Sequence, residues 1–153
     1  RDGRSTINSD NKGIFTIRTE GSNWEIDASD KKSTRSSNIV LHIEGLYANP
    51  EGTIGTYPIG SSNGLKGIDG PDNTNVFCRI WNEEKESYQT YLSFEQSGII
   101  EITKIDRIPS IQNIISGNFT LKMVDRATAT DTIEVTLGRF DLETISLPQK
   151  SWD

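Results

Sequence analysis

Residues 117–140, GNFTLKMVDRATATDTIEVTLGRF, carry the clearest two-residue alternation in the chain. The apolar members of each run share one face of an extended strand, first Gly117, Phe119, Leu121 and Met123, then Ile133, Val135 and Leu137. The polar segment 125–131 separates the two runs, so the stretch predicts a β-hairpin with one buried face. We expect Gly138 and Arg139 to form a bulge that turns Phe140 inward.

The same alternation recurs along the rest of the chain. Further strands are expected in five places: a hairpin over 15–28, a strand over 39–43, an edge strand over 53–57 that ends at Pro58, a hairpin over 76–94, and a strand over 98–106. Residues 108–113 are ambiguous and could hold a helical turn, and the glycine-rich segment 61–75 is expected to be a long loop. About nine short strands and no convincing helix predict an all-β fold, an antiparallel β-sandwich or an open barrel.

The alternation also predicts which side chains form the core. These are the residues on the apolar side of their strands: Trp24, Ile26, Leu41, Phe119, Leu121, Ile133 and Val135. Cys78 shares a face with Val76 and Ile80, so we expect this single cysteine to be buried, reduced and inert.

Length and charge restrict the classes of function. A chain of 153 residues fits one domain, and its net charge of −6 disfavours nucleic acid as a partner. No apolar run approaches the length of a membrane span. The chain begins at Arg1 in a polar stretch, so we expect a flexible segment over 1–12, following a removed targeting region, and a single β domain over 13–153.

Five stretches carry a resemblance to a known family. They are Trp24 after a hairpin turn, GTYPIG at 55–60, ITKID at 102–106, ISGNF at 115–119 and IEVTLGRFD at 133–141. In this order the chain after Gly13 resembles a family of small exported lipoprotein domains of Bacteroidetes that has no assigned function. The resemblance implies an all-β domain in the periplasm or at the cell surface, tethered by a lipid on a cysteine that would precede Arg1. It implies no catalytic residue and no cofactor.

The titratable residues do not form a catalytic pattern. His42 is the single histidine and lies on the polar face of its strand, where solvent exposure is the ordinary state, and no zinc-binding set can be drawn. Glu83, Glu84 and Glu86 crowd one turn, where solvated charge is common. We therefore expect no enzyme. Asp69, Asp72 and Asn73 are a candidate calcium site, but their spacing does not match an EF-hand loop and Asp-Gly and Pro-Asp are ordinary turn sequences, so a plain loop is the favoured interpretation.

Aromatic residues offer the one candidate binding surface. If Ile80 and Leu92 point to the core, then Trp81 and Tyr91 point outward, and Tyr57 could join them. The alternative is that Phe77, Trp81 and Tyr91 pack beneath the loop 61–75. We expect a non-enzymatic binding or structural module of the cell envelope, with a glycan or an envelope protein as partner. The alternatives are a carbohydrate-binding domain that uses these aromatics for a neutral sugar, and a small barrel that encloses an apolar ligand.

Overall fold

The computed structural model describes residues 14–20, 23–30, 35–46, 48, 52–108 and 112–145, and the predicted flexible segment 1–12 lies outside them. The described chain consists of β-strands and one short 3-10 turn, η1 (Gly67–Asp69). The strands are β1 (Ile14–Glu20), β2 (Asn23–Asp30), β3 (Ser37–Ile43), β4 (Gly55–Ile59), β5 (Asn75–Asn82), β6 (Ser87–Leu92), β7 (Gly98–Ile108), β8 (Gln112–Asp125) and β9 (Thr132–Ile145). Within the ambiguous stretch 108–113, Ile108 ends β7 and Gln112 begins β8, while residues 109–111 lie outside the described part.

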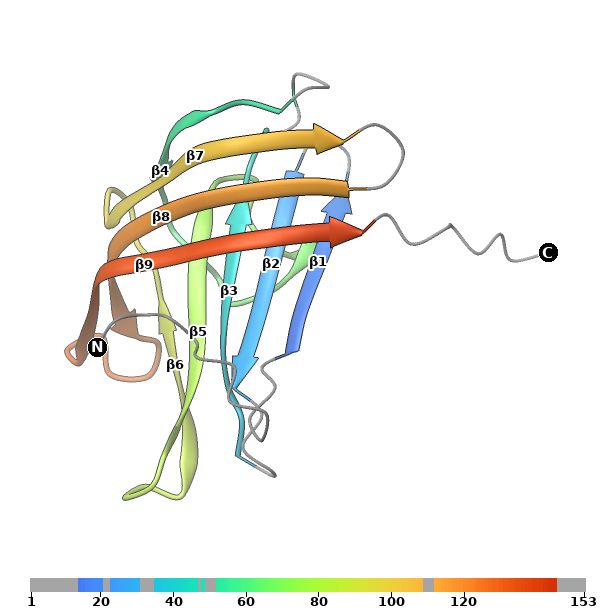
Figure 1. Cartoon of the computed structure of the whole chain (residues 1–153). Helices are drawn as coiled ribbons and strands as arrows, with labels where there is room; N and C mark the ends of the chain where they lie inside the picture. Colours follow the sequence, from blue (N-terminus) through green and yellow to red (C-terminus); the bar gives the residue numbers. More distant parts are fainter. Residues whose placement is uncertain are drawn as a thin grey trace.

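All nine strands belong to one antiparallel sheet that bends into two layers. The first layer has the order β1-β2-β3-β5-β6, and the second has the order β4-β7-β8-β9. The end of β8 joins the layers, because Val124 and Asp125 pair with Leu92 and Tyr91 of β6. Figure 1 shows β7, β8 and β9 running across the strands of the first layer. The sheet does not close, so the predicted all-β, open antiparallel architecture is confirmed.

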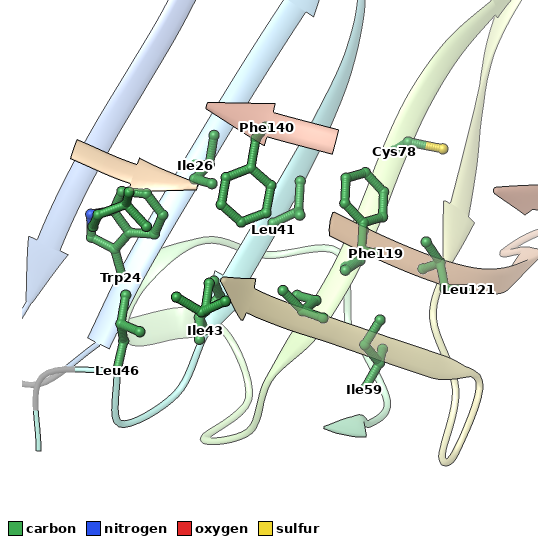
Figure 2. Packing of buried hydrophobic residues seen from close by; sticks show 14 of the residues in the cluster. Trp24, Ile26, Leu41, Ile43, Leu46, Ile59, Cys78, Phe119, Leu121 and Phe140 are labelled. Atoms are coloured by element: carbon green, nitrogen blue, oxygen red, sulfur yellow. The ribbon is translucent and has the colours of Figure 1, made fainter. Parts of the chain in front are cut away.

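The core lies between the two layers. Its buried side chains come from both, and they include Trp24, Ile26, Leu41, Ile43, Ile100, Ile102, Ile115, Phe119, Leu121, Met123 and Phe140. Figure 2 shows Trp24, Phe119 and Phe140 within this cluster. Five of the predicted core residues are thus confirmed as buried. The other two, Ile133 and Val135, are only partly buried and pack against the edge of this cluster.

Two phenylalanines of the core each face a glycine on the neighbouring strand. Gly117 of β8 pairs with Phe140 of β9, and Phe119 of β8 pairs with Gly138 of β9. A Cβ atom on Gly138 would lie 2.3 Å from the Phe119 ring, and one on Gly117 would lie 2.6 Å from the Phe140 ring. The rings therefore occupy the space that a facing side chain would fill. Two Gly-x-Phe sequences on adjacent antiparallel strands give this reciprocal arrangement, with ring centroids 6.5 Å apart.

The bulge in the β8–β9 hairpin lies earlier than predicted. Phe119 pairs with Gly138 whereas Leu121 pairs with Val135, so Thr136 and Leu137 together oppose Thr120. The extra residue reverses the alternation before Gly138 and not after it. Phe140 therefore points inward as expected, but Leu137, which we expected on the apolar face, is 69% exposed.

The segment between β4 and β5, Gly60–Thr74, forms a strap over the outer face of the first layer. Lys66 forms an ion pair with Asp27 of β2, and the Gly67 N–H donates to the Glu25 carboxylate at 3.1 Å. At its other end Gly64 lies against Leu92 of β6. Val40 and Phe77, which lie between Asp27 and Leu92 in the same cross-strand row, are both buried. The first layer is therefore covered by the second layer on its inner face and by the strap on its outer face. The buried position of Phe77 agrees with the expectation that it packs beneath this loop.

Candidate functional site

Tyr91 belongs to the core, so the expectation that it points outward is wrong. It pairs with Cys78 on the inner face of the hairpin and is 5% exposed. Its hydroxyl donates to the Asp131 carboxylate at 2.8 Å. Burial, followed by the hydrogen bond and charge of Asp131, raises the pKa of Tyr91 to about 12. The prediction assumed that the hydrophobic residue Leu92 points to the core. Leu92 instead lies under the strap on the outer face, so Tyr91, its neighbour in β6, points to the core.

Tyr57 does not join Trp81 on one surface. It lies in β4 of the second layer, partly buried against the core, and its hydroxyl donates to the Thr53 carbonyl oxygen at 2.6 Å. Burial raises the pKa of this phenol, and the hydrogen bond to Thr53 lowers it by less. The three predicted aromatic residues therefore lie in three different surroundings and form no common binding platform.

Trp81 does lie on the outer face of the first layer, where it is half-buried in an arginine–aromatic cluster. Its ring meets the edge of the Tyr88 ring at 5.0 Å, and the Arg35 guanidinium lies 5.0 Å from its centroid. The Arg79 guanidinium lies 4.1 Å from the Tyr88 centroid. The Trp81 indole N–H is shielded from solvent and has no partner among the described residues. Because guanidinium groups occupy faces of both rings, we do not assign Trp81 as a sugar-stacking platform.

This cluster lies where the β5–β6 hairpin extends past its covers. Residues 75–78 of β5 are buried, whereas residues 79–82 are exposed or half-buried. Ile80, expected in the core, is 37% exposed although it shares the inward face of Cys78. Figure 1 shows the hairpin projecting beyond the strands that cross it. Side chains continue to alternate between the two faces along β5, but those beyond residue 78 are no longer buried because the second layer does not cover this end of the hairpin.

A groove of about 420 Å³ lies beside this part of the hairpin. Two segments line it, Lys85, Ser87, Tyr88, Gln89 and Thr90 from the hairpin, and Asp125, Arg126, Ala127 and Thr128 from the turn between β8 and β9. The Arg126 N–H donates to the Thr90 carbonyl oxygen at 2.8 Å, which fixes the two walls relative to each other. The groove thus combines one aromatic ring with hydroxyl, amide and cationic side chains.

The single acid in the wall is already engaged within its own turn. Asp125 is buried, and its carboxylate accepts hydrogen bonds from the Ala127 N–H and the Thr128 hydroxyl, both at 3.1 Å. By contrast, neither Lys85 nor Arg126 has a carboxylate within 4.0 Å in the part of the chain that the structure describes. The free polar groups of the groove are therefore mainly donors and hydroxyls.

The other predicted chemistry is dispersed. His42 is more buried than its polar strand face suggested, with a ring nitrogen 3.0 Å from the Glu44 carboxylate and another 4.0 Å from that of Glu25. Asp69 and Asp72 are both exposed, and the described residues contain no group of three His, Cys, Asp or Glu side chains that could hold a metal ion. The calcium hypothesis for Asp69, Asp72 and Asn73 therefore gains no support from the arrangement.

Cys78 is a free, buried cysteine, as predicted. Burial raises the pKa of its thiol to about 12, so that the reactive thiolate is scarce at neutral pH. Its chemical inertness stays a prediction.

The chain matches no protein-family model, no curated protein and no solved structure. Among the described residues there is no helix with the length and apolar character needed to cross a membrane.

The sequence analysis missed Tyr88, Lys85 and Arg126. Tyr88 shares a strand face with Leu92, a face that the apolar Leu92 suggests is directed to the core, and the structure puts both side chains on the outer face. Arg126 lies in a turn distant in sequence from the hairpin, and only the short β6–β8 pairing brings the two together. The pairing of Cys78 with Tyr91 is the signal that could have placed Tyr88. A buried cysteine favours a buried residue opposite it, and if Tyr91 is buried, alternation along β6 puts Tyr88 on the outer face.

Proposed function

We propose that this protein is a non-enzymatic carbohydrate-binding module whose ligand occupies the groove beside Tyr88. The observation that carries the proposal is the composition of that groove. Ser87 and Thr90 supply hydroxyls beside the Tyr88 ring. The Thr128 hydroxyl also lines the groove but donates to Asp125, and the Gln89 amide lines it while its oxygen accepts from the Asn82 amide at 2.6 Å. Sugars offer hydroxyls to such groups. The Arg79 guanidinium covers one face of the Tyr88 ring, so this ring contributes an apolar wall to the groove and is not assigned as a stacking platform. The volume falls in the range of small-molecule sites, roughly 300–1,000 Å³.

Two features of the groove favour binding over catalysis. Its one carboxylate, Asp125, already accepts two hydrogen bonds from its own turn. Glu25, His42 and Glu44 belong to β2, β3 and the turn that follows β3, under the strap, and none of them lines the groove. A general acid or base must reach the proton that it transfers, and neither set supports that role here.

The rival hypothesis of a barrel with an apolar ligand gains no support from the described core. The space between the layers is occupied by large side chains such as Trp24, Phe119 and Phe140, which contact one another (Figure 2). The outer groove is therefore the better candidate site.

We propose the periplasm or the cell surface as the location of this module. The support is the resemblance of residues 115–119 and 133–141 to exported lipoprotein domains. Fractionation of cells that express the full-length gene, with detection in membrane and soluble fractions before and after surface proteolysis, tests the location independently of the ligand. Recovery in the cytoplasm would contradict it.

Titration of isotope-labelled protein with a panel of neutral and acidic oligosaccharides, followed by amide chemical shifts, tests the binding proposal. We expect at least one sugar to shift the amides of residues 85–90 and 126–128. Tyr88→Ala should abolish these shifts. Tyr57→Phe, which alters a phenol in the other layer, serves as the matched control and should retain them. Shifts confined to other regions, or none with any sugar, would overturn the proposal.

A further inference from the structure

We infer that the groove selects an acidic sugar, one that carries a carboxylate or a sulfate, and that Arg126 and Lys85 hold its anionic group. This inference rests on the proposed carbohydrate-binding function and narrows the class of ligand. It also reverses the expectation of a neutral ligand that the net charge of −6 supported.

The cations around the groove are unpaired. Lys85 and Arg126 line it, and Arg79 stacks on Tyr88, whose ring forms part of the wall. Within the described residues none of the three has a carboxylate within 4.0 Å, whereas Arg35 pairs with Glu83 at 2.9 Å and Lys104 with Asp106 at 2.9 Å. A guanidinium without a partner presents a planar set of N–H donors that matches a carboxylate or sulfate.

Within the described residues, no nearby acid forms an ion pair with these cations. Asp125 is turned into its own loop, where the Ala127 N–H and the Thr128 hydroxyl hold it. Asp131 accepts the Tyr91 hydroxyl on the inner side. Glu84 and Glu86 are exposed in the hairpin turn but do not line the groove. The wall therefore offers two free cations against one engaged carboxylate, within a chain that is acidic as a whole.

The remaining wall chemistry favours a sugar over a polyphosphate. Three hydroxyl side chains and one amide line the groove, which suits a ligand rich in hydroxyls with widely spaced charges. The net charge of −6 repels dense polyanions such as nucleic acid, because their phosphates extend beyond the groove into the negative field of the whole domain. A short acidic oligosaccharide carries few charges beyond those that the cations contact, because it does not extend far outside the groove.

Calorimetric titration with four defined probes tests the inference. The probes are tetragalacturonate, its fully methyl-esterified form, a chondroitin sulfate tetrasaccharide and a ten-residue oligothymidylate. The ester keeps the sugar rings and removes the charge. We expect tetragalacturonate, the sulfated probe or both to bind, with affinity that falls as NaCl rises from 50 to 500 mM, and the ester to bind at least about tenfold more weakly. The two acidic probes separate a carboxylate from a sulfate as the group recognised.

Variants of the protein localise the effect. Arg126→Gln should weaken binding of the acidic probe about tenfold or more, because it removes one charge-assisted contact and leaves the backbone hydrogen bond to Thr90 intact. Arg139→Gln removes an exposed arginine from β9 and should leave affinity unchanged. Amide spectra of both variants establish that the fold is retained.

Each other result has a distinct meaning. Equal binding of the ester and the free acid, or unchanged affinity in Arg126→Gln, would overturn the acidic-sugar inference and leave the carbohydrate-binding proposal standing. Tighter binding of oligothymidylate than of any sugar would overturn the inference as to ligand class. Failure of all four probes, together with failure of the neutral panel, would overturn both proposals.

Discussion

Two aromatic pairs in this domain differ in what faces their rings. Phe119 and Phe140 lie in the core with ring centroids 6.5 Å apart, and each faces a glycine of the neighbouring strand. Trp81 and Tyr88 lie at the projecting end of the β5–β6 hairpin with centroids 5.0 Å apart, and each is faced by an arginine. Both pairs come from antiparallel neighbours.

The difference shows that a ring in a strand takes its role from its neighbours. A glycine lets the facing ring lie directly on the backbone, which excludes water and gives a packing role. An arginine leaves the ring at the surface and adds charged donors beside it. The first pair should therefore dominate the free energy of unfolding, and the second should affect ligand binding with little effect on stability.

Truncation of the core pair should have the largest effect. Phe119→Ala should lower the free energy of unfolding by about 3–5 kcal/mol, because it removes a buried ring and leaves a cavity. Urea titration followed by circular dichroism measures this change. A loss below about 1 kcal/mol would show that the glycine-faced pair is no more important than the arginine-faced one.

Alkaline pH should destabilise the inner side of the β5–β6 hairpin. The pKa of Tyr91 is raised to about 12 in the fold from an ordinary value of 10.0, so the stability it contributes is fully present below pH 10 and is lost as pH rises towards 12. Two pKa units correspond to about 3 kcal/mol at most. Cys78 adds to the same loss above pH 9, because burial raises the pKa of its thiol as well.

Unfolding titrations between pH 8 and 12 measure this loss. Tyr91→Phe should flatten the decline, whereas Tyr88→Phe, which changes the outer-face phenol of the same strand, should leave it in place. An equal slope in wild type and Tyr91→Phe would contradict the buried position of the hydroxyl.

A methyl group at Gly138 should test the ring-on-glycine contact directly. Gly138→Ala should cost about 1–3 kcal/mol, since its Cβ would lie 2.3 Å from the Phe119 ring. Phe119→Leu removes the atoms in conflict, so the same alanine should cost less in that background. A double-mutant cycle by urea unfolding should give a coupling of at least about 1 kcal/mol. Additive costs would mean that the contact is not the reason for the glycine.

The smallest effect on stability is expected in the arginine–aromatic cluster. Arg79→Gln removes the guanidinium above Tyr88 and should change the free energy of unfolding by less than about 1 kcal/mol, because the pair lies at the surface. Thermal unfolding of this variant beside Arg139→Gln provides the measurement and its control. A loss comparable to that of Phe119→Ala would make the cluster structural.

The sequence predicted the strands and the main core face because alternation is a local signal. Trp24, Leu41 and Phe119 follow directly from it, and so does the buried position of Cys78. The faces of β6 could not be assigned in this way, since Tyr91 packs on the second layer while Leu92 packs under the strap. When both faces of a strand are covered, hydrophobicity no longer tells them apart.

The candidate groove depended on information that no single stretch contains. Arg126 reaches Thr90 only because β8 extends past β7 and pairs with β6. The net charge of −6 suggested a neutral ligand, but a sum over the chain does not report which cations lack partners. Local charge is a property of the fold, and a sequence total does not reveal it.

The path of the chain through β4 has a consequence for folding during synthesis. β3 pairs with β5, but between them the chain crosses to the second layer, adds β4 to the edge of β7 and returns as the strap. The hairpins β1–β2, β5–β6 and β7–β8 need only near neighbours and can form within microseconds. β4 must wait until β7, beginning at Gly98, has left the ribosome. Docking of β4 therefore cannot precede the synthesis of β7. Until the strap closes over Phe77, the outer face of the first layer is open to chaperones.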